Sequence, residues 1–131
     1  MNFEEITLNQ DFNTATDVVI AALAAEGFGI ISRVDMHAAF KEKLGIDFPP
    51  YSILGACNPK LAHTAVTAEP AIGLLLPCNV TVEQIEGGTR VRIPDAEEML
   101  GGSGLSDAPE LTDLAEDAGA RLARVVAVLR G

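Results

Sequence analysis

The sequence predicts an α+β fold in which a curved, mostly antiparallel sheet is covered by the first helix and the long C-terminal helix, with short helices in the middle. Three observations lead to this prediction. Strand-like and helix-like segments alternate at first but not to the end of the chain, unlike a doubly wound parallel sheet. Gly87-Gly88 separates two strand-like runs and indicates a hairpin. Residues 109–130 repeat apolar side chains at spacings of three and four, as in a helix with one apolar face.

The first third of the chain predicts a strand, a helix and a second strand. Residues 3–9 roughly alternate and indicate the first strand. A helix is expected over about 14–26, with Asn13 or Thr14 as its N-cap and Gly27 as a left-handed residue that ends it. The second strand, 28–34, is expected to carry on one face Phe28, Ile30, Ser32 and Val34.

The middle of the chain is marked by capping residues. Asp35 is predicted to cap a short helix over 36–44. A strand follows over 51–57. Asn58 at the N-cap and Pro59 at the first helical position then predict a helix over 59–68.

The last elements form a hairpin and a long helix. Residues 72–85 predict a long strand broken at Pro77, because proline cannot donate to the ladder. Its partner strand spans 89–94. Residues 95–108 are rich in glycine and acidic residues and are expected to form a mobile surface loop. The helix over 109–130 has an apolar stripe made of Leu111, Leu114, Ala118, Leu122, Val125 and Leu129.

Composition restricts the class of protein. The chain has 131 residues, a formal charge of −10 and 48% apolar residues. This length fits a single domain, 1–131, and the apolar content excludes a disordered chain. An excess of acidic residues argues against binding nucleic acid, which needs a basic surface.

Nothing in the sequence indicates a membrane span or a signal peptide. The longest uninterrupted apolar run, Val18 to Ala25, is far shorter than the about 20 residues that cross a bilayer. The N-terminus has no basic region followed by an apolar one. Two cysteines are fewer than disulfide-stabilised secreted domains usually carry. We therefore expect a cytoplasmic protein with reduced thiols.

Two short motifs resemble each other. In each motif an asparagine follows a cysteine, and a proline lies within two residues of that cysteine. The motifs are Ala56-Cys57-Asn58-Pro59 and Leu76-Pro77-Cys78-Asn79. The cysteines can be small buried apolar residues, or they can form a thiol site. In the second case a helix N-terminus next to Cys57 would lower its pKa, and the pair could form a reversible disulfide or bind a soft metal.

These motifs also carry a family resemblance. Together with Gly27-Phe28-Gly29-Ile30, the segments 53–59 and 73–80 resemble the family called domain of unknown function 302, and the resemblance spans nearly the whole chain. It implies a β-α-β4-α arrangement similar to TATA-binding-protein-like domains, often as a homodimer. It implies no known reaction, and fold similarity of this kind does not transfer DNA binding.

The candidate ligand-binding residues are Cys57, Asn58, Cys78, Asn79 and Asp35. We expect the two cysteines to lie close together with both asparagines nearby, because freed backbone groups beside proline need hydrogen-bond partners. Such a cluster is either a polar knot that stabilises the sheet or a ligand site edged by thiols. Asn58 and Asp35 can instead act only as helix caps.

Other chemistries lack their residues. His37 and His63 form no paired spacing with the cysteines, so no metal site is predicted. The glycines between 101 and 104 lack the lysine of a phosphate loop, and no Gly-x-Ser-x-Gly motif is present. No catalytic residue and no cofactor can be assigned.

Three functional hypotheses remain, in this order. The first is a module that binds a small ligand in an apolar cleft, with 95–108 as its lid, and it is favoured because no catalytic constellation is found. The second is a thiol-dependent redox or soft-metal-handling protein that uses Cys57 and Cys78. The third is a homodimeric interaction domain.

Overall fold

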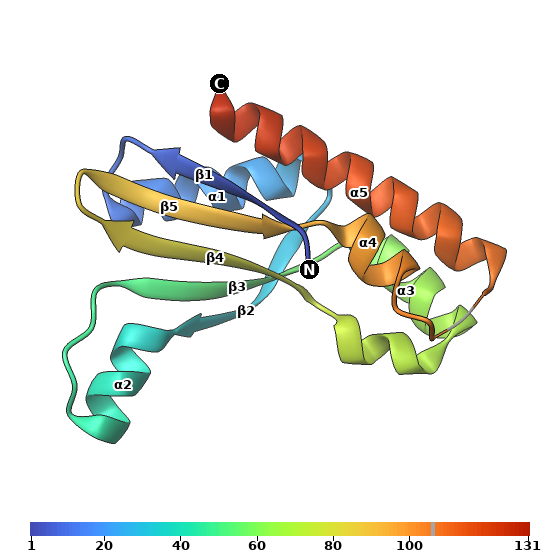
Figure 1. The fold of residues 1–131 in the computed structure, drawn as a ribbon, viewed down its shortest axis with the longest axis horizontal. Helices are drawn as coiled ribbons and strands as arrows, with labels where there is room; N and C mark the ends of the chain where they lie inside the picture. The colour runs from blue at the N-terminus through green and yellow to red at the C-terminus, as the bar shows by residue number, and fades with distance from the viewer. Residues whose placement is uncertain (106) are drawn as a thin grey trace.

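The fold is built on one five-stranded antiparallel sheet with the strand order β1-β5-β4-β3-β2 (Figure 1). A computed structural model describes residues 1–105 and 107–131. The strands are β1 (Phe3–Leu8), β2 (Gly29–Asp35), β3 (Tyr51–Cys57), β4 (Cys78–Ile85) and β5 (Gly88–Pro94). The helices are α1 (Phe12–Ala25), α2 (Met36–Leu44), α3 (Pro59–Ala68), the 3-10 helix η1 (Pro70–Leu75), α4 (Ala96–Gly101) and α5 (Pro109–Arg130). The predicted α+β class is confirmed.

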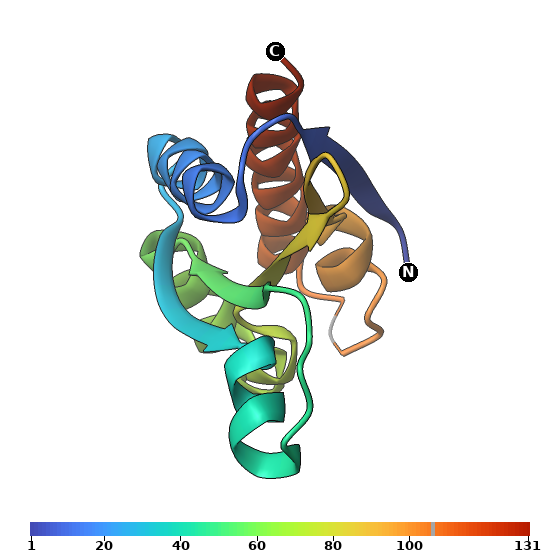
Figure 2. The same ribbon diagram turned by 90° about the vertical axis from the view of Figure 1, so that its left-hand side faces the viewer.

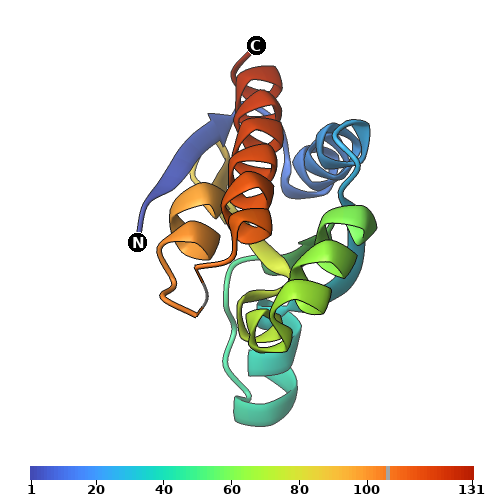
Figure 3. The same cartoon turned by 90° about the vertical axis from the view of Figure 1, so that its right-hand side faces the viewer.

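The helices α1 and α5 cover one face of the sheet. The strands β1 and β2 lie at opposite edges, so α1 crosses that face to connect them. In Figure 3, α5 runs between α4 on one side and α1 and α3 on the other. The core therefore forms between the sheet and these helices, while α2 projects beyond the ends of β2 and β3 (Figures 1 and 2).

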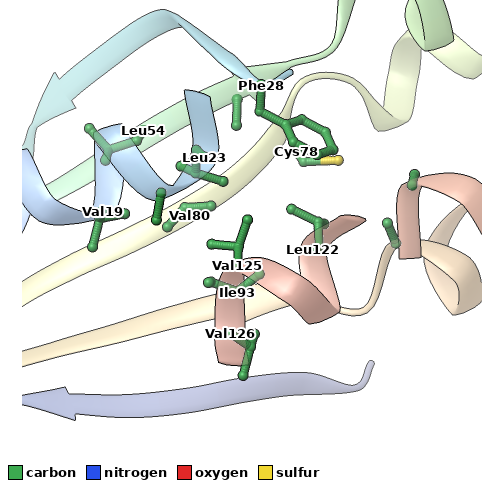
Figure 4. Close-up of a cluster of buried hydrophobic side chains, with 14 of the residues drawn as sticks. Val19, Leu23, Phe28, Leu54, Cys78, Val80, Ile93, Leu122, Val125 and Val126 are labelled. Carbon is green, nitrogen blue, oxygen red and sulfur yellow. The ribbon is translucent and has the colours of Figure 1, made fainter. Parts of the chain in front are cut away.

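The predicted apolar stripe of α5 is buried. Leu122 and Val125 pack into one cluster with strand residues from the covered face, among them Leu54, Val80 and Ile93 (Figure 4). The first helix adds Val19 and Leu23 to the same cluster. Because fully burying such a side chain stabilises the fold by about 1.5–3 kcal/mol, this cluster is the main source of stability.

Two details of the first half differ from prediction. The N-cap of α1 is Asp11, not Asn13 or Thr14, because the Asp11 carboxylate accepts a hydrogen bond of 2.7 Å from the backbone N–H of Thr14. In β2, the register shifts between Ile30 and Ser32, and this bulge reverses the alternation of side chains.

As a result, the predicted common face of 28–34 is wrong. Phe28 is buried in the core, whereas the bulge turns Val34 to the other face of the sheet, where it is 46% exposed.

The predicted strand over 72–85 begins later than expected. Residues 70–75 form η1, because Pro70 occupies the start of a helix and the Glu69 carboxylate accepts a hydrogen bond of 3.1 Å from Ala71 N–H. Ile72 is still fully buried, but from a helix. The break predicted at Pro77 is present, and β4 begins at Cys78.

The predicted loop over 95–108 contains a helix. Asp95 caps α4 by accepting a hydrogen bond of 3.1 Å from Glu98 N–H, and Glu97 and Glu98 add negative charge to its first turn. Ala96 and Leu100 are buried, so tertiary packing stabilises a segment whose glycines and acids suggested a loop. Residue 106 of the predicted loop lies outside the described residues.

No helix in residues 1–105 and 107–131 is both long and apolar enough to cross a membrane.

Truncation of the α5 stripe tests this architecture. Leu122→Ala should lower the free energy of unfolding by about 2–5 kcal/mol, because it leaves a cavity between α5 and the sheet. Val128→Ala on the same helix should change it by less than about 0.5 kcal/mol, since Val128 is 67% exposed. Denaturant melts measure both values, and equal small losses would show that the stripe contributes nothing.

Candidate functional site

The two cysteines meet at neighbouring strand ends, as predicted. β3 ends at Cys57 and β4 begins at Cys78, and Cys78 is paired with Ala56, the residue before Cys57. Both cysteines and Asn58 line one small cavity. The rest of its wall is apolar and includes Phe28, Leu61, Leu76, Leu100 and Leu114.

The Cys78 thiol is poorly suited to react. Its side chain is buried on the covered face of the sheet, in the cluster shown in Figure 4. Burial, together with the nearby Cys57 thiol, raises the pKa of Cys78 from 9.0 to about 11. The thiol is therefore protonated near neutral pH, whereas the thiolate is the nucleophile and the metal ligand.

Asn58 is a helix cap at a crowded junction. Its side-chain oxygen accepts a hydrogen bond of 3.3 Å from Leu61 N–H at the start of α3, which confirms the capping hypothesis. Gly27 ends the first helix with φ +86°, and a Cβ there would lie 2.8 Å from the Asn58 amide nitrogen. Arg121 of α5 donates to the carbonyl of Glu26 at 3.0 Å. Asn58 thus belongs to a junction of α1, α3 and α5.

Asn79 does not join this cluster. It is paired with Gly55 and is exposed, and successive strand residues point to opposite faces, so it lies on the face opposite Cys78. The expectation that both asparagines accompany the cysteines therefore holds for Asn58 and is wrong for Asn79.

Asp35 occupies the N-cap position of α2 but makes no capping hydrogen bond with its side chain. The register pairs it with Ser52, whose hydroxyl donates to the carboxylate at 2.7 Å, and Arg33 donates to the same oxygen at 2.9 Å. These hydrogen bonds lower the pKa of Asp35. The predicted capping role is wrong because Ser52 of β3 and Arg33 of β2 itself engage the carboxylate. Asp35 is also not among the residues that line the cysteine cavity.

The cysteine cavity is too small for a ligand. Its volume is about 20 Å³. A single water needs at least about 10–15 Å³ and several polar partners, and this wall is mostly apolar. In the described part of the chain, no three His, Cys, Asp or Glu side chains lie where they could share a metal ion. The geometry fits a packed structural junction.

A larger cleft lies elsewhere, along α5, and sequence reasoning missed it. This α5 cleft has a volume of about 550 Å³ and is bounded by the start of β1, the end of β5, the start of α4 and one side of α5. Its apolar floor includes Ile93, Leu122 and Val126.

Small residues of α5 keep the α5 cleft open. Gly119, Ala123 and Ala127 line it at spacings of four, which places them on one side of the helix. Larger side chains at these positions would fill the space. The only signal in the sequence was this spacing of small residues beside the leucine stripe, and the walls opposite come from β1 and α4, far away in the chain.

Charged groups line the α5 cleft at both ends of the helical stripe. Arg130 donates to the Glu4 carboxylate at 2.8 Å near the C-terminal end of α5. Asp95 and Glu97 lie at the start of α4, and Glu97 is next to Gly119. Between these ends, eleven residues of helix rise about 17 Å.

Comparisons with known proteins agree with the fold. The sequence matches the family described as "Domain of unknown function DUF302" over residues 4–129. A similar solved structure is the crystal structure of the uncharacterized conserved protein DUF302 from Bacillus stearothermophilus, at 28% sequence identity and a TM-score of 0.82. The match covers 97% of each chain. The comparison with curated proteins gives no match.

The state of Cys78 can be tested by pH. The folded protein holds the thiol proton to about pH 11, whereas the unfolded chain loses it near 9.0. The free energy of unfolding should therefore fall as the pH rises from about 9 towards 11. Cys78→Ala should flatten this pH dependence.

Thiol labelling in the folded protein gives the matching control. A water-soluble disulfide reagent should modify half-buried Cys57 well before Cys78. Rapid labelling of Cys78 at neutral pH would contradict the buried, protonated thiol.

Proposed function

The chain belongs to the DUF302 family, whose function is unknown, and we propose that it is a small-ligand-binding module whose site is the α5 cleft. The observation that carries the proposal is the size and lining of this cleft. Its volume of about 550 Å³ lies within the about 300–1,000 Å³ of small-molecule sites.

The chemistry of the lining supports the same proposal. Binding sites for small molecules combine a mostly apolar surface with a few polar groups that orient the ligand. The α5 cleft combines an apolar floor with carboxylates and one guanidinium. Most of its lining residues belong to helices and strands, so little ordering would accompany binding. The segment expected to be a lid supplies one wall through α4.

A thiol-dependent redox or soft-metal role for Cys57 and Cys78 has less support. The raised pKa of Cys78 keeps its thiol protonated near neutral pH, and the cavity next to it holds at most one water. We propose instead that these residues stabilise the fold in the cytoplasm, where thiols stay reduced.

Filling the α5 cleft tests the ligand-binding proposal. The neutral fluorophore N-phenyl-1-naphthylamine should bind the wild-type protein saturably, with a rise in fluorescence. Ala123→Leu should weaken that binding by about tenfold or more, equivalent to about 1.4 kcal/mol, because the new side chain occupies the cleft.

Ala120→Leu is the matched control. Ala120 is exposed on the same helix but does not line the cleft, so this variant should bind the fluorophore like wild type. Equal loss in both variants, or no saturable binding to wild type, would contradict the proposal.

We also propose that the protein associates with itself through the uncovered face of the sheet. On this face Val34 is 46% exposed and lies opposite half-buried Ile53. In the described part of the chain, the hydroxyl of Thr81 is buried on this face with no hydrogen-bond partner. The exposed apolar surface would be removed from water by a docked surface.

The charges of this face favour a second copy of the chain. Arg92 contacts both Glu83 and Glu5, and Arg90 lies 3.6 Å from Glu83, so acidic and basic groups balance there. Two chains that each carry a charge of −10 would repel one another least through a neutral face. The loop after α2 extends this surface through Phe48, which is exposed and contacts Tyr51, the register partner of Glu83.

A charge placed on this face tests self-association. Light scattering over a wide range of protein concentration should detect a wild-type homodimer, and Val34→Glu should weaken it by at least about tenfold, because the interface would bury two unpaired carboxylates. Val66→Glu introduces the same charge on α3, where Val66 is 42% exposed, and should leave the dimer intact. A monomer at every concentration, or equal effects of both variants, would refute this interface.

A further inference from the structure

We infer that the α5 cleft takes a small amphipathic cation, a molecule with an ammonium head and an apolar, unbranched body. This inference rests on the proposed ligand-binding function. It deepens that proposal because the residues of the cleft distinguish between cationic, neutral and anionic ligands.

The charges of the lining favour a cation. Three carboxylates line the α5 cleft, those of Glu4, Asp95 and Glu97, against one guanidinium, that of Arg130. Arg130 already contacts Glu4 at 2.8 Å. An anionic ligand would have to compete with Glu4 for Arg130 and would face two further acids. A cation meets two carboxylates that no basic group of the cleft neutralises.

Glu97 is the carboxylate best placed to meet the head group. It lies against Gly119, where an added Cβ would be 3.0 Å from the Cβ of Glu97 and 3.5 Å from its carboxylate oxygen. Glycine is unfavourable inside a helix, and here it leaves room for Glu97 to lie along α5. Across residues 1–105 and 107–131, neither an ion pair nor a hydrogen bond engages the Glu97 carboxylate.

The floor of the α5 cleft favours an apolar, unbranched body behind the ammonium head of the ligand. Beyond Glu97 the lining is apolar: the nearly buried Leu122 and Val126 form its base, and the small, exposed Ala123 and Ala127 leave the path along the helix open. An unbranched apolar body lying along this path would bury its surface on them. The acidic protein as a whole, with a charge of −10, attracts cations and repels anions on approach.

Three probes with the same eight-carbon chain separate charge from apolar binding: octylammonium, 1-octanol and octanoate. Each is added to the 131-residue chain below the aggregation concentration of the probe, and the backbone amides of residues 119–130 are followed by NMR. Octylammonium should bind about two- to fivefold more tightly than 1-octanol, the range of an exposed ion pair, and octanoate more weakly than either. Added salt should weaken only octylammonium.

Glu97→Gln removes the charge with little change in shape. It should weaken octylammonium by about two- to fivefold and leave 1-octanol unchanged. Glu110→Gln is the matched control, because Glu110 is exposed in the first turn of α5 and does not line the cleft. This variant should bind both probes like wild type.

The outcomes separate the two proposals. If octylammonium is preferred and Glu97→Gln abolishes the preference, the cation inference stands. If all three probes shift the same amides with similar affinity, the cation inference is overturned while the α5 cleft remains a binding site. If no probe shifts these amides, the ligand-binding proposal fails and the cation inference fails with it.

Discussion

The packing of α5 against the sheet is the constraint on which the other features depend. The two edge strands β1 and β2 are connected by α1, which leaves the part of the covered face near β1 to another element. Among the helices of residues 1–105 and 107–131, α5 alone is long and apolar enough to cover it, through residues such as Leu122 and Val125. The short helices α3 and α4 then pack on its two sides, as Figure 3 shows. Both the cysteine cavity and the α5 cleft include residues of this helix.

Elements with a strong local signal could be predicted from sequence. The predicted ranges 51–57, 59–68 and 109–130 agree with β3, α3 and α5. Each of these segments contains its own signal: alternation in the first, the Asn58-Pro59 start in the second and the apolar stripe in the third. The elements that were missed depend on distant partners. Helix α4 forms where Ala96 and Leu100 can be buried, and the bulge of β2 is defined by its pairing with β3. Composition alone indicated a loop in the first case and regular alternation in the second.

The sequence predicted only those parts of the candidate site that have a local signal. Adjacent strand ends bring Cys57 and Cys78 together, and the sequence predicted Asn58 as a helix cap. The side on which Asn79 lies follows from the register of β3 with β4, which no local pattern specifies. The α5 cleft was invisible because its walls are joined only by folding: Glu4 and Glu97 meet a stripe of α5 that begins at Gly119. A small residue on a helix gives no indication of a binding site until the surface opposite it is known.

The Cys-Asn motifs and the proposed ligand site lie in different places because they are next to different sides of α5. One side buries the leucines and valines that hold the sheet. A second edge carries Arg121, which reaches the end of α1 beside the Gly27–Asn58 contact and so connects the Cys-Asn motif to the helical layer. A third side carries Gly119, Ala123 and Ala127, whose small size leaves space for Glu97 and for the cleft beside it. Crowded positions restrict the residue type tightly, as at Gly27, where a Cβ would approach Asn58. An open cleft needs only that side chains stay small, so its residues look ordinary in the sequence while their position along the helix creates the space that a ligand can occupy.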